Sequence, residues 1–144
     1  WNCKRKGKGR NSLESKGILP DTCAWIDYFR QGSTPLAQSL DASLTTDAVY
    51  CCGPVLFELM QGVRSKLELE TLLRILNALP FLDMTQATWI KAGQLSSSLR
   101  KAGKSLPISD ILIAALAMEH HLAVLTEDDH FFAIPGVIIK PIDI

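Results

Sequence analysis

The sequence predicts an α/β sandwich built on a parallel β-sheet. Short apolar runs, such as residues 48–52 and 123–126, alternate along the chain with longer segments whose apolar residues recur at helical spacing. Strands that alternate with helices form right-handed βαβ units, and such units make parallel sheets. The chain has 144 residues, 47% of them hydrophobic, which suits one domain with a core of its own.

The first part of the predicted domain contains two strands and four helices. We expect strands at residues 18–21 and 48–52, and helices at residues 23–31, 35–44, 55–61 and 67–79. Gly32 and Gly62 each follow a run of helical spacing, and glycine commonly ends a helix. Pro54 suits the first position of a helix, because the N–H that proline lacks is unpaired there in any case.

The second part contains three strands and two helices. We expect strands at residues 81–84, 123–126 and 137–142, and helices at residues 85–102, with Thr85 as the N-cap, and 108–118. Helix 108–118 is apolar on all sides apart from Ser109 and Asp110, so it should be buried on more than the side that faces the sheet. Another helix of the same chain or a second copy would cover it, and we expect a homodimer.

Charge is distributed unevenly along the chain. Residues 1–17 contain six basic groups and one acid, and we expect them to form a flexible basic arm in front of a domain at residues 18–144. That arm either binds RNA or is upstream sequence with no role in the domain. The formal net charge is zero, so the domain carries −5, and its bulk charge gives no argument for a nucleic-acid partner.

Several classes of protein are excluded by composition. No apolar run approaches the ~18 residues of a membrane span, and the basic N-terminus is not followed by a signal-peptide core. The four cysteines include no CxxC pair, so neither a zinc site nor a disulfide framework is indicated; they are Cys3, Cys23, Cys51 and Cys52. We therefore expect a cytoplasmic protein without a membrane partner.

Three aspartates fall where a parallel sheet places its functional loops. Asp21 ends the first predicted strand, Asp128 lies two residues beyond strand 123–126, and Asp110 opens helix 108–118. In parallel α/β domains the loops at the carboxyl ends of the strands hold the site. A purely structural role is also open: Asp110 would favour a helix N-terminus, and Asp21 and Asp128 would be turn residues.

Glu58 is the single polar residue in the run 55–60, which exceeds one helical turn. Its carboxylate either lies on a narrow solvent-facing stripe or points at a cation, since an unpaired buried charge is costly. Four carboxylates without histidine or cysteine ligand spacing favour a hard cation, Mg²⁺ or Mn²⁺. His120 and His121 suit a helix end, whereas His130 follows the acidic turn and could contact a substrate.

Four segments, in this order along the chain, resemble the motifs of PIN-domain proteins, specifically the VapC-type toxins of bacterial toxin–antitoxin pairs. They are residues 18–29, residues 56–59 followed by Gly62, residues 106–115 and residues 125–131. The resemblance implies a three-layer α/β/α sandwich around a parallel sheet. It also implies a ribonuclease that uses Mg²⁺ or Mn²⁺, an antitoxin partner and a homodimer.

By motif position, the resemblance implies an acidic quartet that is both catalytic and metal-binding: Asp21, Glu58, Asp110 and Asp128, with Asp129 as the alternative to Asp128. Thr22 and Thr126 match hydroxyl residues that support the first and last acids. The activity implied is hydrolysis of RNA phosphodiester bonds, which inhibits translation. Two other functions stay open: a non-catalytic PIN-like interaction module, and a metal-dependent phosphatase for a small phosphoester.

Overall fold

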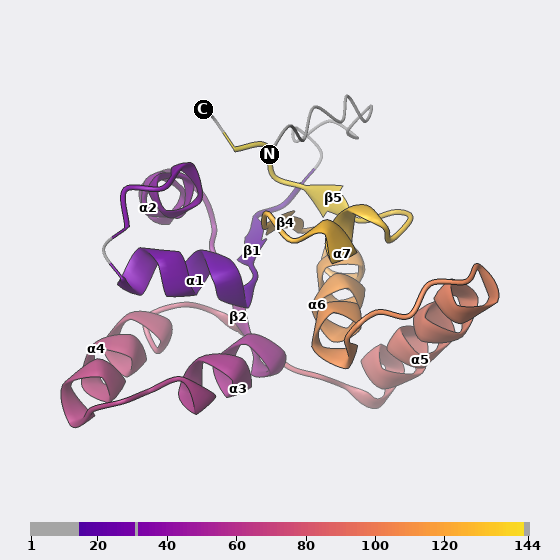
Figure 1. Ribbon diagram of the computed structural model, residues 1–144, viewed down its shortest axis with the longest axis horizontal. Coiled ribbons are helices and arrows are strands. Elements are labelled where there is room, and N and C mark those ends of the chain that lie inside the picture. Colours follow the sequence, from indigo (N-terminus) through magenta and orange to yellow (C-terminus); the bar gives the residue numbers. More distant parts are fainter. Residues whose placement is uncertain (1–14, 31, 143–144) are drawn as a thin grey trace.

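The computed structural model describes residues 15–30 and 32–142, and parallel strands lie at its centre (Figure 1). Strands β1 (Ile18–Pro20), β4 (Ala123–Leu125) and β5 (Ile138–Ile139) form a parallel sheet in the order β1-β4-β5. Strands β2 (Cys51–Cys52) and β3 (Phe81–Leu82) form a parallel pair. A bridge between Ile18 and Val49 joins the pair to β1.

Helices connect these strands and lie on both sides of them (Figure 1). They are α1 (Thr22–Phe29), α2 (Pro35–Thr46), α3 (Gly53–Gln61), α4 (Lys66–Leu76), α5 (Gln86–Lys101), α6 (Ile108–Glu119) and α7 (Asp129–Phe132). The predicted α/β sandwich around a parallel sheet is therefore confirmed. None of the described helices is long and apolar enough to cross a membrane.

Local sequence explains where most of the helices begin. Thr34, Ser65 and the predicted N-cap Thr85 each accept a hydrogen bond from the backbone N–H three residues later. The short strands and α7 differ from the sequence prediction. Strands β2, β3 and β5 contain two residues each, because pairing with a neighbouring strand extends over only part of each apolar run.

Helix α4 also ends earlier than predicted, at Leu76 rather than Leu79. The N–H groups of Ala78 and Leu79 bond to carbonyls three residues back, at 3.2 and 3.1 Å, which is a tighter turn than the α-helix. Helix α7 was not predicted, because its four residues are too few to produce a periodic pattern.

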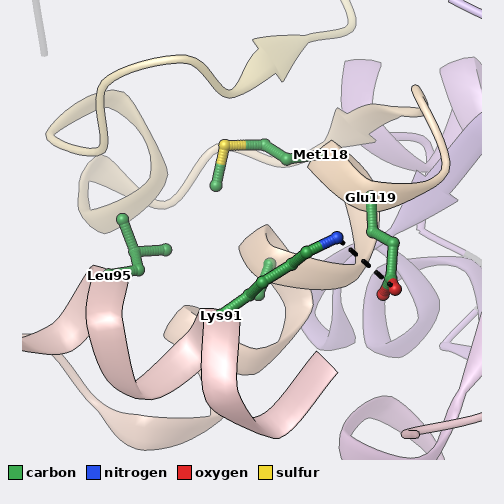
Figure 2. A pocket seen from close by; sticks show the side chains of 5 residues that line it. Lys91, Leu95, Met118 and Glu119 are labelled. Atoms are coloured by element: carbon green, nitrogen blue, oxygen red, sulfur yellow. Dashed lines mark ion pairs between the residues drawn. The ribbon is translucent and has the colours of Figure 1, made fainter. Parts of the chain in front are cut away.

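Helix α6 is covered within the chain. Its residues 111–117 are all buried, and α6 packs against α5, α3, α7 and β4. Figure 2 shows the groove that remains between α5 and α6, about 200 Å³ in volume, with an ion pair between Lys91 and Glu119 at 3.8 Å. Because other elements of the same chain cover residues 111–117, the apolar residues around this part of α6 do not indicate that a second copy packs there.

Residues 16 and 17, which the sequence assigned to the N-terminal arm, form hydrogen bonds next to the sheet. Lys16 donates a backbone hydrogen bond to the carbonyl of His121 (2.9 Å), and the Gly17 carbonyl accepts one from Ala123 (3.0 Å). These two residues of the predicted arm therefore pair with the segment at β4. Residues 1–14 of the arm lie outside the described residues.

Gly17 provides a test of this packing. A Cβ atom at Gly17 would lie 2.7 Å from the Ala48 carbonyl oxygen and 2.9 Å from Cε2 of Tyr50, too close for either to stay in place. We expect Gly17→Ala to lower the free energy of unfolding by about 1–3 kcal/mol, as overpacking typically does. Urea unfolding followed by circular dichroism measures this difference.

Gly93→Ala is the matched control, because Gly93 lies on the exposed side of α5 and no atom of another side chain or element lies within 4 Å of the position that its Cβ would take. Alanine at an exposed helical position should raise the free energy of unfolding by about 0.5–1 kcal/mol. Equal effects at the two glycines would contradict the packing described for Gly17.

Candidate active site

The carboxyl ends of β1 and β4 lie side by side, and this brings two of the predicted site residues together. Pro20 pairs with Leu125 in the parallel register, and the N–H of Asp21 donates to the Leu125 carbonyl at 3.1 Å. Asp21 and Thr126 therefore leave adjacent strands at the same level. The Thr126 hydroxyl donates a short hydrogen bond to Oδ2 of Asp21.

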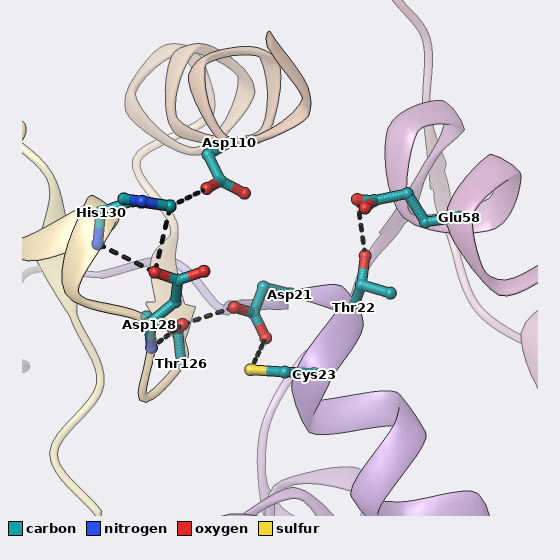
Figure 3. Close-up of polar contacts among 8 residues, drawn as sticks. All are labelled: Asp21, Thr22, Cys23, Glu58, Asp110, Thr126, Asp128 and His130. Atoms are coloured by element: carbon teal, nitrogen blue, oxygen red, sulfur yellow. Dashed lines mark hydrogen bonds and ion pairs between the residues drawn. The ribbon is translucent and has the colours of Figure 1, made fainter. Parts of the chain in front are cut away.

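Asp21 is only 4% exposed, and hydrogen-bond donors hold its carboxylate (Figure 3). Besides Thr126, the backbone N–H of Ala24 donates to Oδ1 at 3.1 Å, so Asp21 is also the N-cap of α1. The Cys23 thiol donates to the same oxygen at 2.9 Å. Burial raises the pKa of Cys23 to about 12, so the thiol keeps its proton and stays a donor at neutral pH.

Asp128 is fixed by the start of α7. Its Oδ1 accepts a hydrogen bond from the N–H of His130 at 2.9 Å, which makes Asp128 the N-cap of this helix. Its own N–H donates to Oγ1 of Thr126 at 2.9 Å. The buried Thr126 hydroxyl thus links the Asp21 carboxylate to the backbone of Asp128.

Asp110 and His130 complete a cluster with Asp128 (Figure 3). Asp110 lies in the first turn of α6, and its side chain is 13% exposed. Nδ1 of His130 is 2.7 Å from Oδ2 of Asp110 and 3.2 Å from Oδ1 of Asp128. The neighbouring Asp129 is exposed and is not part of the cluster, so of the two adjacent acids it is Asp128 that lies beside Asp110.

Glu58 stands apart from this cluster. It lies on α3, half-buried, and its Oε1 accepts a hydrogen bond from the Thr22 hydroxyl at 2.9 Å. In Figure 3 its carboxylate is across the site from His130, on the side of α1 and α3. The partner that the structure shows for Glu58 is thus the Thr22 hydroxyl.

The aspartates of the site disfavour one another's charge. Burial raises the pKa of Asp21, the negative charge of Asp128 adds to that rise, and the hydrogen bonds from Cys23, Thr126 and Ala24 oppose it. Burial also raises the pKa of Asp110, Asp128 and Asp21 add to the effect, and His130 opposes it. A cation among these carboxylates would offset both the burial and the repulsion.

The donor groups fit a divalent cation. One atom each from Asp110, Asp128 and His130 lie within 4.8 Å of one another, and the Asp21 carboxylate interacts electrostatically with both aspartates. Carboxylate oxygens are the ligands that Mg²⁺ and Mn²⁺ prefer.

The sequence pattern did not place His130 among these groups, because its nearness to Asp110, 20 residues earlier, depends on how α6 and α7 pack.

Fold and site together define a parallel α/β domain with an acidic cluster at the carboxyl ends of its strands. A family model for the PIN domain matches residues 18–137. The chain thus belongs to the PIN domain family, and the resemblance noted in the sequence is confirmed.

Relatives with curated names point to the VapC group of this family. The chain is 33% identical over 124 residues to ribonuclease VapC11 of Mycobacterium tuberculosis, an alignment that covers 83% of this chain and 92% of the relative. It is 31% identical over 135 residues to ribonuclease VapC5 of the same organism, covering 88% of this chain and 93% of the relative.

Solved structures show the same fold. A toxin–antitoxin complex from Klebsiella pneumoniae has a chain that is 27% identical with a TM-score of 0.66, covering 88% of this chain and 99% of that one. VapBC2 from Rickettsia felis, bound to a DNA fragment from its promoter, matches with a TM-score of 0.75 at 22% identity, covering 88% and 98%. At that lower identity the likeness concerns the fold alone.

Burial of Asp21 predicts how pH affects the metal-free protein. Because its pKa is raised in the folded state, the folded chain binds more protons than the unfolded chain, whose aspartates titrate near ~4. The contribution of Asp21 to stability therefore falls as pH rises from about 4 through the raised pKa. Asp21→Asn keeps an N-cap side chain and removes this dependence.

We expect Asp21→Asn in EDTA to gain stability relative to the parent as pH rises, by about 1.4 kcal/mol for each unit by which the folded pKa is raised. Urea unfolding at several pH values between 4 and 8 measures the difference. Asp129→Asn, at an exposed neighbouring position, is the control. A parent that gains stability relative to Asp21→Asn over this range would contradict the burial effect.

Proposed function

We propose that this chain is the toxin of a type II toxin–antitoxin system, a Mg²⁺- or Mn²⁺-dependent endoribonuclease that hydrolyses RNA phosphodiester bonds and so inhibits translation. The observation that carries the proposal is the convergence of Asp21, Asp110 and Asp128 at the carboxyl ends of β1 and β4. The names of the relatives, ribonucleases of the VapC group, support the choice of RNA. An RNA substrate and an antitoxin partner would place the protein in the cytoplasm.

Asp21, Asp110 and Asp128 would hold the cation, and Glu58, the fourth acid of the quartet, lies across the site from His130. A bound divalent ion supplies Lewis-acid polarisation of the phosphate and activation of water near neutral pH. The chain itself supplies fixed geometry: Thr126 and Cys23 hold the carboxylate of Asp21, and Thr22 holds that of Glu58. Groups fixed in this way need little reorganisation when charge develops on the phosphate.

Basic side chains near the acidic cluster would hold the RNA backbone. Lys104, which follows α5, is exposed, and its Nζ donates to the Ala133 carbonyl at the end of α7, at 3.0 Å. This contact keeps a positive charge close to the helix that carries His130. Arg100 and Lys101, in the last turn of α5, are also exposed and would extend the basic edge toward a longer RNA.

An antitoxin protein is the proposed partner, because the structural neighbour from Klebsiella pneumoniae is a toxin–antitoxin complex. A homodimer stays a prediction. Phe57 on α3 and Ile108 on α6 are 64% and 71% exposed, and the two helices are in contact. Analytical ultracentrifugation of the chain alone and with its antitoxin shows whether the chain forms a dimer by itself.

Cleavage of a structured RNA in Mn²⁺ or Mg²⁺ tests the proposal. We expect cleavage to stop in EDTA and to fall by about 10²–10³-fold in Asp110→Asn, similar to the loss when one preorganised hydrogen-bond donor to the transition state is removed. Asp129→Asn, one residue beyond the cluster, should keep parental activity. Full activity of Asp110→Asn would remove Asp110 from the site, and hydrolysis of a small phosphoester without RNA cleavage would favour the phosphatase.

Expression in a bacterium without the antitoxin provides a second test. We expect induced expression of the parent to arrest growth and reduce incorporation of labelled amino acids, and Asp110→Asn to do neither at the same soluble level. Normal growth with soluble, metal-loaded parent protein would favour the non-catalytic interaction module.

A further inference from the structure

The side chain of His130 lies among the proposed cation ligands, although its role so far is that of a hydrogen-bond partner. It comes from the first turn of α7, close behind the N-cap Asp128. Its ring reaches Asp110 on α6 as well as Asp128, so it contacts two carboxylates that belong to different elements (Figure 3). Both contacts use the same ring atom, Nδ1.

These contacts have the spacing of neighbouring ligands around one ion. Nδ1 is 2.7 Å from the Asp110 oxygen and 3.2 Å from the Asp128 oxygen. In an octahedral site with bonds of about 2.0–2.1 Å, adjacent ligand atoms are about 3 Å apart. Nδ1 and the two carboxylate oxygens can therefore face one ion with only small side-chain adjustments.

We infer that His130 is a nitrogen ligand of the cation that Asp110 and Asp128 hold, and that this ligand makes the site favour Mn²⁺ over Mg²⁺. The inference rests on the proposed function. With the ring proton on Nε2, Nδ1 has a free lone pair that can bind a cation beside the two carboxylates. Imidazole is a good ligand for transition metals, whereas Mg²⁺ selects carboxylate and water oxygens.

A purely structural role for His130 makes a different prediction. In that role the ring only links two carboxylates through hydrogen bonds, and a cation that enters the site takes the place of the imidazole. Loss of the ring would then leave Mn²⁺ binding unchanged or strengthen it. Whether a histidine nitrogen coordinates the bound ion therefore distinguishes the two roles, and this can be measured independently of catalytic activity.

Pulsed electron paramagnetic resonance of bound Mn²⁺, with ¹⁵N-labelled histidine, is the direct test. The chain contains three histidines, so His120→Gln, at an exposed position at the end of α6, is the matched control. We expect ¹⁵N coupling in the parent and in His120→Gln, and none in His130→Ala. We also expect His130→Ala to bind Mn²⁺ about 10–100-fold more weakly, the loss typical of groups that support a metal site.

His130→Asp adds a second readout, because it replaces the nitrogen with oxygen. We expect the ratio of Mg²⁺ to Mn²⁺ dissociation constants, measured by calorimetry, to fall in this variant. Bound Mn²⁺ without ¹⁵N coupling in the parent, or with coupling retained in His130→Ala, would overturn the inference and leave the proposed function standing. A parent that binds no Mn²⁺ or Mg²⁺ would overturn both.

Discussion

The pairing of β1 with β4 is the constraint on which the rest of the site depends. The parallel register of Pro20 with Leu125, continued by the bond from the Asp21 N–H to the Leu125 carbonyl, fixes the height at which both strands end. A shift of one residue would turn the side chains of one strand to the opposite face of the sheet. Asp21 would then lose the Thr126 hydroxyl, and Thr126 would no longer join Asp21 to the loop of Asp128.

The cost of this arrangement is that carboxylates are held close together, with those of Asp21 and Asp110 largely away from water. Asp21 and Asp110 both have raised pKa values, mainly through burial. Neutral donors reduce the cost at Asp21, where a hydroxyl, a thiol and a backbone N–H surround the carboxylate. Such donors leave the aspartates without a full counter-charge, and a divalent cation would supply one.

Much of the fold could be predicted from the sequence, because continuous apolar strands and amphipathic helices have distinct patterns. Asp110 shows how a structural and a functional interpretation can both hold: it lies in the first turn of α6 and faces the cluster. Asp128 likewise caps α7 and contacts His130. Residues at the starts of these helices can satisfy both interpretations, which is why their positions in the sequence left both open.

The contacts among the site residues could not be predicted, because they depend on how elements far apart in the sequence pack together. The Thr22–Glu58 bond joins residues 36 positions apart, and His130 reaches Asp110 only because α7 packs on α6. Which of Asp128 and Asp129 lies beside Asp110 also required the structure, in which Asp128 caps α7 and Asp129 is exposed. The sequence also left open whether another helix of the same chain or a second copy covers α6. The structure shows that helices of the same chain cover it.

The central claim, that the carboxylates at the ends of β1 and β4 hold a catalytic cation, can be tested most directly by crystallography. The measurement is anomalous diffraction from crystals of the chain grown with Mn²⁺. We predict a strong anomalous peak within bonding distance of the Asp110 and Asp128 carboxylates and next to Asp21. A well-ordered site with no peak among these side chains, or with the ion bound elsewhere, would contradict the claim.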